Sequence, residues 1–363
     1  MSRVLLVGKG YPDRGGIPTF LHTLQEGELG DLHEITFLNV AHFGTPEGGE
    51  VTAGNIGRTL RDARNVFRMA KDQDIVHIHS ALAPAVTVGR AGLLALAGRL
   101  RGAKVVLHAH GGNIETWLTT RRAKLLMRLA MLPASHVVAV WSAGERTLRG
   151  ALGRGRVSLI DNGVDTARFA PTDTDHEASR PPRILYVGLL TPRKGVLDLI
   201  EASRLLRADG VEHELLLLGG VPDEGPEAAE PVLAAAEGVA RLLGTRPPED
   251  MPAAYADADV FCLPSWWEAM PLSVLEAMSA GLPVVASDVG DVSRLVTPAC
   301  GTVVPTKDPR RLADALRGPL VDPELRRQQG KESRARAVEA FSSTATARAI
   351  DRVFHDVRHG DHA

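Results

Sequence analysis

The stretch from Leu263 to Gly290, LPSWWEAMPLSVLEAMSAGLPVVASDVG, places a strand, a turn and a helix in succession. The apolar run 259–263 predicts a buried strand, and residues 272–280 predict a helix. Gly281 is expected to cap this helix at its C-terminus, with Pro283 just beyond it. Pro271 suits the first helical position. Similar strand–helix units recur along the chain.

Two glutamates stand out in this stretch because they flank the predicted helix start. Glu268 falls in the turn and Glu276 about one turn into the helix. A helix N-terminus presents free backbone N–H groups that favour an anion such as phosphate. We therefore expect a phosphorylated ligand across the helix start, with a carboxylate reaching hydroxyl groups on each side of the phosphates.

Glu276 lies among apolar neighbours, where an unpaired carboxylate costs several kcal/mol. Two partners remain open for it at this point. A salt bridge to Arg193 or Lys194 is the structural alternative, and a ribose diol is the functional one. The free N–H groups of Leu272 and Ser273 would point at a phosphate.

Strands and helices alternate over the whole chain, which is the pattern of parallel sheets covered by helices on both faces. The first half predicts helices near 17–27, 58–72, 84–100, 119–132 and 143–150, and the last residues predict helices over 325–340 and 344–357. The predicted strands are 4–7, 35–38, 75–78, 105–108, 136–140, 157–160, 184–187, 214–218, 240–243, 260–263, 284–286 and 302–304.

Residues 161–182 predict a linker, because they are polar and contain prolines. An acidic patch covers 173–177 within this stretch. With 363 residues the chain exceeds the usual size of one core. We therefore expect an α/β protein of two doubly wound domains, 1–170 and 171–342. Ligands of such sheets bind at the carboxyl ends of the strands, so a substrate is expected in a cleft that the two domains face.

The composition, with 44% hydrophobic and 24% charged residues, is that of an ordinary soluble globular protein. The two cysteines, Cys262 and Cys300, have no disulfide or metal-type spacing, and they favour a reducing cytoplasm. No signal peptide is expected before the first strand. The apolar run 81–98 contains Pro84 and Arg90, so we do not expect it to span a membrane.

Residues 1–180 hold 22 Lys and Arg against 17 Asp and Glu, a net charge of +5. Two interpretations of the basic helices stay open: solvated faces, or a peripheral docking face for anionic lipid or a diphosphate-linked acceptor. No aromatic residues are interleaved, so nucleic acid is not an expected partner. The cations are Arg58, Arg61, Arg64, Arg68 and Lys71 on one helix, and Arg121, Arg122, Lys124 and Arg128 on another.

Arg193-Lys194-Gly195 follows the first strand of the second half, where two cations can neutralise a diphosphate. A solvated helix start is the alternative, but cations there oppose the helix dipole. In the first half, Gly15-Gly16 precedes a helix and lets backbone N–H groups approach an anion. A plain tight turn is the alternative, which the glycine pair taken alone favours because the spacing is not the full GxGxxG pattern.

Four histidines end two neighbouring strands, His77 and His79 on one and His108 and His110 on the next. They lack an acidic or thiolate fourth ligand, so a metal site is not expected. We expect satisfied core histidines, except for His110, which precedes Gly111-Gly112 and should emerge at the sheet edge.

These motifs together, in this order, resemble those of the retaining glycosyltransferases of family 4, which have the GT-B fold of two Rossmann-like domains. The resemblance covers essentially the whole chain. The motifs are Gly15-Gly16, HIHS at 77–80, HAHG at 108–111, NGVD at 162–165, VGLLTPRKG at 187–195, and Glu268 with Glu276 followed by AMSAGLPVVASDVG.

The resemblance implies catalytic roles for His110, Arg193, Lys194 and Glu268. Arg193 and Lys194 would bind the diphosphate without a metal, Glu268 the sugar hydroxyls, and Glu276 the ribose. The base would stack near 243–246. The helix 343–358 would pack back on the N-terminal domain. The implied donor-binding residues are Gly15, Gly16, Gly188, Arg193, Lys194, Leu243, Gly244, Glu268, Ala269, Met270, Pro271, Leu272, Ser273 and Glu276.

One departure from the family pattern is Ala269, where a glycine is usual. Its methyl group narrows the backbone approach to the sugar and is expected to alter donor choice. Trp266 and Trp267 place large rings beside the same site, either packed under it or shaping the sugar pocket.

The expected activity is that of a cytoplasmic retaining hexosyltransferase without a cofactor. The donor would be a UDP-sugar, with GDP-mannose second, bound by the C-terminal domain. The acceptor on the N-terminal domain would be a lipid-linked saccharide of bacterial surface polysaccharide biosynthesis or a small metabolite. A sugar-nucleotide epimerase or hydrolase, and a non-catalytic subunit, stay open as alternatives.

Overall fold

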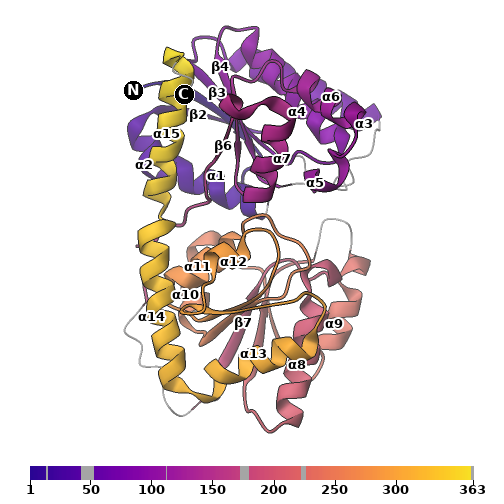
Figure 1. Cartoon of the computed structure of the whole chain (residues 1–363), viewed down its shortest axis with the longest axis vertical. Coiled ribbons are helices and arrows are strands. Elements are labelled where there is room, and N and C mark those ends of the chain that lie inside the picture. Colours follow the sequence, from indigo (N-terminus) through magenta and orange to yellow (C-terminus); the bar gives the residue numbers. More distant parts are fainter. Residues whose placement is uncertain (14, 42–52, 112, 172–179, 222–225, 361–363) are drawn as a thin grey trace. The chain divides into compact units, whose positions relative to one another are not determined.

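The computed structural model describes residues 1–13, 15–41, 53–111, 113–171, 180–221 and 226–360. The chain divides into two compact units, which we call unit 1 (Met1–Asn162 with Ser343–Ala363) and unit 2 (Gly163–Ser342). Each unit contains a six-stranded parallel sheet with helices on its faces (Figure 1). The predicted acidic patch at 173–177 lies outside the described residues.

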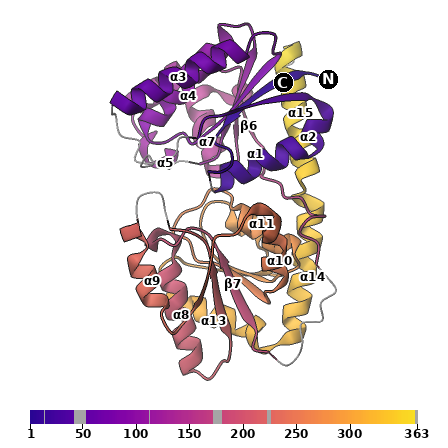
Figure 2. The same ribbon diagram turned by 180° about the vertical axis from the view of Figure 1, so that it is seen from behind.

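The sheet of unit 1 has the strand order β2-β1-β3-β4-β5-β6. Its strands are β1 (Arg3–Gly8), β2 (Glu34–Asn39), β3 (Ile75–Ser80), β4 (Lys104–Ala109), β5 (His136–Ala139) and β6 (Val157–Leu159). Its helices are α1 (Gly16–Glu26), α2 (Glu28–Leu32), α3 (Ala53–Met69), α4 (Ala85–Arg99), α5 (Ile114–Trp117), α6 (Arg121–Ala130), α7 (Ser142–Leu152) and α15 (Ser343–His359). The last helix, α15, lies along α1 and α2 (Figure 2).

The sheet of unit 2 has the order β12-β11-β10-β7-β8-β9. Its strands are β7 (Arg183–Val187), β8 (Glu214–Leu218), β9 (Arg241–Gly244), β10 (Val260–Leu263), β11 (Val284–Ser287) and β12 (Gly301–Val304). The helices that cover it are α8 (Val196–Ala208), α9 (Glu230–Ala236), α10 (Met251–Ala256), α11 (Leu272–Ser279), α12 (Val292–Leu295), α13 (Pro309–Val321) and α14 (Pro323–Ala340).

The two strand orders explain where each unit can bind a ligand. Counted from its own first strand, unit 2 has the order 3-2-1-4-5-6, and unit 1 has 2-1-3-4-5-6. Both are doubly wound, and both confirm the predicted Rossmann-like α/β class. The connections leave in opposite directions from the first strand of each sheet, so a crevice opens at the carboxyl ends of β1 and β3, and of β7 and β10.

The periodicity located the strands because those of a doubly wound sheet are buried on both faces. β3 and β10 are buried along their whole length. Every predicted strand is present, with its ends shifted by no more than two residues. Among the described residues, no helix combines the length and the apolar character needed to cross a bilayer.

The end of α11 confirms one expectation and corrects another. Gly281 has φ +74°, the left-handed conformation expected of the glycine after a helix. Pro271, however, is the N-cap residue with extended backbone rather than the first helical residue, because the helix begins at Leu272. The cap therefore offers no side-chain acceptor to the first N–H groups of α11.

Candidate functional site

In unit 2, strands β7 and β10 are parallel neighbours, so the loops that follow them meet at one edge of the sheet. The loop after β7 carries Lys194, and the loop after β10 carries Glu268. Lys194 Nζ lies 2.6 Å from Glu268 Oε1, and both side chains are largely buried. A charge-assisted hydrogen bond of this length fixes both groups at the crevice. The side chain of Arg193, next to Lys194, is exposed.

Gly195 explains how closely the two loops approach. It has φ +69°, and a Cβ built on it would lie 1.9 Å from the backbone oxygen of Pro264. The backbone N–H of Trp266 in turn donates to the backbone oxygen of Arg193 over 3.1 Å. The RKG motif is therefore held against the loop after β10 by backbone contacts that leave no room for a side chain.

Replacing Gly195 with Ala is expected to destabilise unit 2 and to weaken ligand binding by Lys194. A methyl group in the left-handed region costs about 1–2 kcal/mol by itself, and here it also meets backbone. The matched control is Gly210→Ala, because Gly210 has φ +76° but open space around a Cβ. Urea unfolding should show a larger loss for Gly195→Ala. Equal losses in the two variants would contradict the proposed contact.

Trp266 is a packing residue beside the site. Its Nε1 donates to Asp198 Oδ2 over 2.7 Å, and Lys307 Nζ lies 4.4 Å from the centre of its ring. Asp198 belongs to the first turn of α8, so the indole ties the loop after β10 to that helix. Of the two interpretations of this ring, its placement favours packing under the site.

The turn between Glu268 and α11 is held by the loop that follows β11. The N–H of Asp291 donates to the backbone oxygen of Ala269 over 3.0 Å. A Cβ on Gly290 would lie 2.3 Å from the backbone oxygen of Glu268. Ala269 is buried, and among the described residues only Asp72 and Lys307 are non-glycine residues with positive φ. Alanine therefore fits here without backbone strain, unlike a position that requires glycine.

Glu276 is buried on α11, with 8% of its surface exposed. Tyr255 Oη donates to Glu276 Oε2 over 2.6 Å. Burial raises the pKa of Glu276 to about 7, although the Tyr255 hydrogen bond and the charge of Arg168 act in the opposite direction. The predicted alternative of a salt bridge between Glu276 and Lys194 is wrong, because the Lys194 ammonium pairs with Glu268 instead. Glu276 has a neutral partner.

The remaining predicted donor residues of unit 2 lie at the same edge of the sheet. Gly188 follows β7, and a Cβ there would lie 2.6 Å from Tyr186 Oη. Leu243 and Gly244 end β9, where the register with β8 shifts and Gly244 has φ +67°. Gly244 is exposed. Its position at a strand end suits a ligand that extends away from Lys194.

In unit 1, the equivalent edge carries Gly15, Gly16 and His110. Gly15 has φ +121° and caps α1 without a side-chain hydrogen bond. Among the described residues, a Cβ built on Gly15 or on Gly16 would meet no atom within 4 Å. The backbone at the start of α1 is therefore open to an approaching anion, in keeping with the glycine pair.

The four histidines form two hydrogen-bonded pairs across β3 and β4. His79 Nδ1 lies 2.8 Å from His110 Nε2, and His77 Nε2 lies 3.2 Å from His108 Nδ1. The rings of His108 and His110 are stacked at 4.7 Å, and Phe20 packs edge-on against His110. His110 is half-buried, whereas the other three are buried. The sequence predicted this difference in burial.

The histidines are not fully satisfied, which corrects that expectation. Among the described residues, His77 Nδ1, His79 Nε2 and His108 Nε2 are buried without a hydrogen-bond partner. A buried N–H without an acceptor is rarer than an unused acceptor. His79 is therefore best described with its proton on Nδ1, donated to His110 Nε2. His110 then carries its own proton on Nδ1, which makes Nδ1 the hydrogen-bond donor of this ring.

A metal ion is not required to explain this cluster. Nitrogen atoms of His77, His79 and His108 lie within 4.8 Å of one another. In a zinc site, however, each ligand nitrogen lies roughly 2.0–2.1 Å from the ion, and a fourth ligand normally completes the coordination. The pairing of these rings with one another accounts for their position in the core. Metal-independence stays a prediction.

Burial lowers the pKa of His77 and of His110 to about 3, and it lowers the pKa of His79 and of His108 well below the ordinary value of 6.5. In the folded state these rings therefore stay neutral as the pH falls below 6.5, whereas the unfolded chain takes up protons. Because the unfolded state then binds more protons, stability decreases as the pH falls from about 6.5 toward 3.

We expect the melting temperature to fall below about pH 6.5, with up to about 1.4 kcal/mol lost per pH unit for each histidine. His77→Leu should show a shallower acid dependence than the parent, because one of the neutral rings has been removed. Thermal melts at a series of pH values measure the difference. Parallel profiles for parent and variant would contradict this role of the buried rings.

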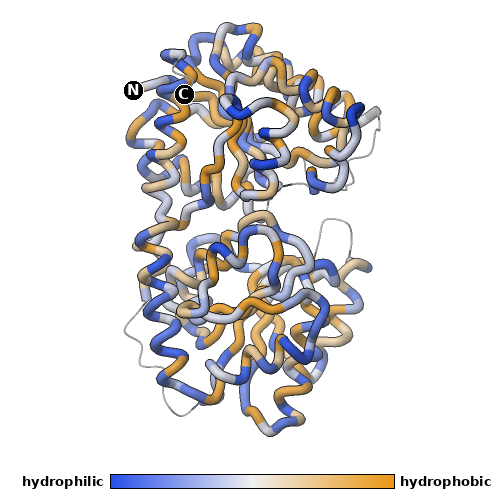
Figure 3. Tube along the Cα trace, viewed as in Figure 1, coloured by the Kyte–Doolittle hydropathy of each residue, from blue (hydrophilic) through white to orange (hydrophobic). Residues whose placement is uncertain are grey.

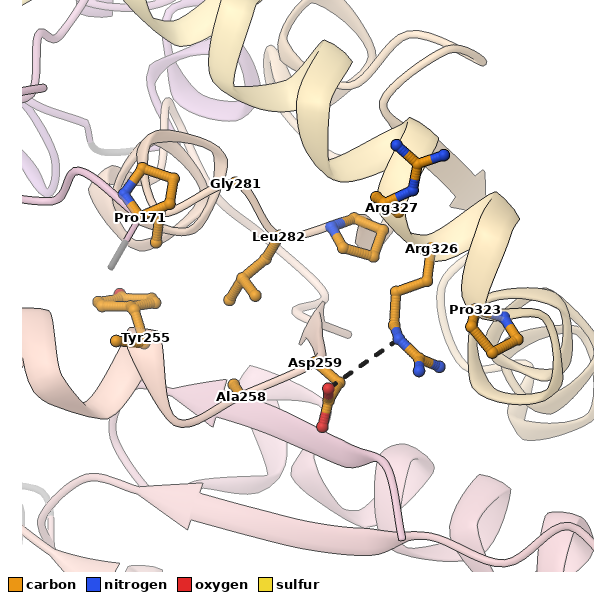
Figure 4. Close-up of a pocket in the computed structure, with 12 residues that line it drawn as sticks. Pro171, Tyr255, Ala258, Asp259, Gly281, Leu282, Pro323, Arg326 and Arg327 are labelled. Carbon is orange, nitrogen blue, oxygen red and sulfur yellow. Dashed lines mark ion pairs between the residues drawn. The ribbon is translucent and has the colours of Figure 1, made fainter. Parts of the chain in front are cut away.

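A pocket of about 240 Å³ lies at the opposite edge of the unit 2 sheet (Figure 4). Its walls include Leu282 and Asp259, which precede β11 and β10, and Arg326, whose Nε lies 3.9 Å from Asp259 Oδ1. Tyr255, whose hydroxyl donates to Glu276, also lines it. This pocket is at the amino ends of the strands, whereas the Lys194–Glu268 pair is at their carboxyl ends.

Two residues near the site carried no signal in the sequence. Tyr255 bonds to Glu276 from α10, a helix that the periodicity did not predict. Gly290 packs against the backbone of Glu268 from the loop after β11. Both contacts arise from the order of the strands, which no local pattern reveals.

The family Glycosyl transferases group 1 matches residues 172–336, and Glycosyltransferase Family 4 matches residues 14–168. A GDP-mannose-dependent alpha-(1-6)-phosphatidylinositol monomannoside mannosyltransferase of Mycolicibacterium smegmatis is 30% identical over 93% of this chain and 94% of that protein. The chain belongs to glycosyltransferase family 4. A phosphatidyl-myo-inositol mannosyltransferase of the same organism is 31% identical, with 94% and 90% covered.

Solved structures show that this family 4 protein has the GT-B fold. A sucrose-phosphate synthase from Thermosynechococcus elongatus superposes with a TM-score of 0.79 at 21% identity, over 99% of this chain and 100% of that one. The Anabaena protein HepE, solved in complex with UDP-glucose, gives a TM-score of 0.74 at 17% identity, with 98% and 100% covered. At these identities the likeness concerns the fold.

Proposed function

We propose that the protein transfers a hexose from a nucleotide diphosphate sugar to a hydroxyl acceptor, with retention at the anomeric carbon and without a metal. The observation that carries the proposal is the pairing of Lys194 with Glu268 at the crevice of unit 2, beside the uncapped start of α11. A cation and free N–H groups there suit a diphosphate, and nearby carboxylates suit hydroxyl groups.

In the proposed reaction the acceptor oxygen attacks the anomeric carbon as the bond to the diphosphate oxygen breaks. The electron pair leaves with the diphosphate, which takes the proton of the acceptor hydroxyl on the same face. Arg193, Lys194 and the N–H groups of Leu272 and Ser273 stabilise the charge on the leaving group. His110, protonated on Nδ1, donates to the sugar.

Glu276 is proposed to hold the ribose and Glu268 the sugar hydroxyls. Lys194 can then change partner, since a bound diphosphate competes with Glu268 for the ammonium. The base would lie near Leu243 and Gly244. The donor-binding unit is therefore unit 2, and the acceptor-binding unit is unit 1.

A UDP-sugar is the favoured donor, supported by the UDP-glucose complex of HepE, and GDP-mannose is second, supported by the mannosyltransferase relative. The acceptor class is a lipid-linked saccharide of surface polysaccharide biosynthesis or a small metabolite. We further propose that the protein works in the cytoplasm, since both cysteines are buried and unpaired.

A donor panel tests the proposal. The protein is heated with UDP- and GDP-sugars in turn, and the cognate donor should raise the melting temperature. That donor is then incubated with saccharide acceptors, with and without EDTA. Proton NMR should show a product with the donor's anomeric configuration in both samples. An inverted product, or rapid epimerisation of the donor without an acceptor, would refute the retaining-transferase reaction.

The variant Ala269→Gly tests the one departure from the family pattern. The methyl group of Ala269 lies at the turn that carries Glu268, so its removal widens the approach to the sugar hydroxyls. We expect the ratio of kcat/KM between two donor sugars to change by roughly tenfold, the effect of about one methylene in a pocket. An unchanged ratio would show that Ala269 does not select the donor.

A further inference from the structure

Exposed apolar side chains are concentrated on one part of unit 1. Sixteen large hydrophobic residues are exposed in the described part of the chain, and ten of them lie on α3, α4 and α6 or directly after these helices. These ten are Ile56, Leu60, Phe67, Val86, Leu96, Leu100, Leu125, Leu126, Leu129 and Leu132. Such a concentration marks an interaction site rather than the scattered exposure of a usual surface.

Helix α6 shows the effect most clearly. Leu125 and Leu129 are at i and i+4 of the helix, so they share one face, and each is 56% exposed. Leu132, in the turn that follows α6, is 65% exposed. The residue that α6 buries is Met127, on the other side. An amphipathic helix normally turns its leucines toward the core. Here the leucine face points away from the protein.

The three helices form one continuous layer. Asp62 of α3 pairs with Arg90 of α4 over 2.9 Å. A Cβ on Gly92 of α4 would lie 2.6 Å from the backbone oxygen of Ala130 of α6, so these two helices are in close contact. Figure 1 shows the three helices side by side. Ile56 and Leu60 of α3 likewise share a face. We call the outward side of this layer the α3–α4–α6 surface.

The charge of this surface is almost entirely positive. The acidic residue of α3, Asp62, is buried in its ion pair with Arg90, and the sequences of α4 and α6 contain no acidic residue. Figure 3 shows hydrophobic and strongly hydrophilic positions interspersed along these helices. The exposed cations are Arg61, Arg64, Arg68, Arg99, Arg121, Arg122 and Arg128.

We propose that the α3–α4–α6 surface docks on an anionic lipid bilayer. The leucines of α6 enter the boundary between headgroups and acyl chains, and the arginines pair with lipid phosphates. The sign of the charge favours this occupant. The exposed charged side chains of α3, α4 and α6 are all arginines, which complement the phosphates of an anionic lipid surface. The inference depends on the surface of unit 1 and is independent of the proposed transfer activity.

Co-sedimentation with vesicles tests this inference. The protein should sediment with vesicles of phosphatidylcholine and phosphatidylglycerol, and added salt should weaken the binding because it screens the arginines. The double variant Leu125→Asp/Leu129→Asp should bind at least about tenfold more weakly, since two apolar side chains no longer enter the bilayer. Val338→Asp is the matched control, because Val338 is an exposed apolar residue of α14 in unit 2.

A second variant keeps the test valid if the leucine variant does not fold. Arg121→Glu/Arg122→Glu changes two exposed residues at the start of α6 and leaves the leucines in place. It should lose binding to anionic vesicles and keep the parent's melting temperature. Binding by either folded variant at the parent's level would overturn the inference. The inference would also be overturned if the parent did not bind vesicles but formed a concentration-dependent dimer that the leucine variant abolished.

Discussion

Replacing Lys194 with Ala is expected to lower kcat for sugar transfer by roughly 10²–10³, the usual effect of removing one preorganised electrostatic group. In the proposed reaction the leaving diphosphate gains negative charge, and no metal neutralises it. Lys194 is a cation fixed at the crevice of unit 2, since its Nζ is held 2.6 Å from Glu268 Oε1. The loss should appear mainly in kcat, because the charge develops in the transition state.

The ion pair with Glu268 adds a second consequence. Lys194→Ala leaves Glu268 largely buried without its partner, which is itself unfavourable. The double variant Lys194→Ala/Glu268→Gln should therefore regain stability relative to Lys194→Ala but not activity. Arg204→Ala removes an exposed cation of α8 and serves as the control. If Lys194→Ala retained activity within about twofold of the parent, Lys194 would not belong to the reaction site.

The second large effect is expected at Glu276, where stability and function should change in opposite directions. The pKa of Glu276 is raised to about 7 by burial, from an ordinary value of 4.5. The folded state therefore binds a proton between about pH 4.5 and 7 that the unfolded state does not, so this group destabilises the fold above pH 7. The penalty near pH 8 is on the order of 3 kcal/mol.

Glu276→Gln removes that penalty and keeps an acceptor for the Tyr255 hydroxyl. We expect its melting temperature without ligand to rise by about 5 °C near pH 8, and the difference to vanish below about pH 4.5, where the carboxyl is protonated in both the folded and the unfolded parent. Donor affinity should fall by about tenfold or more, since a hydrogen bond to a charged group contributes about 1.5–3 kcal/mol. Scanning calorimetry and nucleotide titration measure the two effects.

The control for this prediction is Glu332→Gln, which neutralises an exposed carboxylate on α14 in the same unit. It should change neither the melting temperature nor the affinity. A Glu276→Gln variant that melted lower than the parent near pH 8, with unchanged affinity, would show that Glu276 serves the fold rather than the ligand.

The sequence predicted the strands well because buried parallel strands are continuous apolar runs. Helix α11 and its glycine cap were predictable for a similar reason, since the cap needs a residue that tolerates positive φ. These features depend on residues close together in the chain. The burial of Glu276 could also be predicted, because its neighbours along the helix are apolar.

The partners within the site were not predictable. Lys194 and Glu268 are 74 positions apart and meet because β7 and β10 are neighbours. Tyr255 reaches Glu276 from a short helix without a clear apolar period. The histidine pairs depend on the register of β3 with β4, which places His79 opposite His108. Strand order and register are set by the whole domain, so local patterns did not contain them.

The most direct test of the proposed donor site is isothermal titration of the protein with UDP and with GDP. One of the two should bind with one site per chain, and the affinity should fall by about tenfold or more in Glu276→Gln. Lack of binding of either nucleotide to the folded parent would contradict the account, and so would an affinity that Glu276→Gln leaves unchanged.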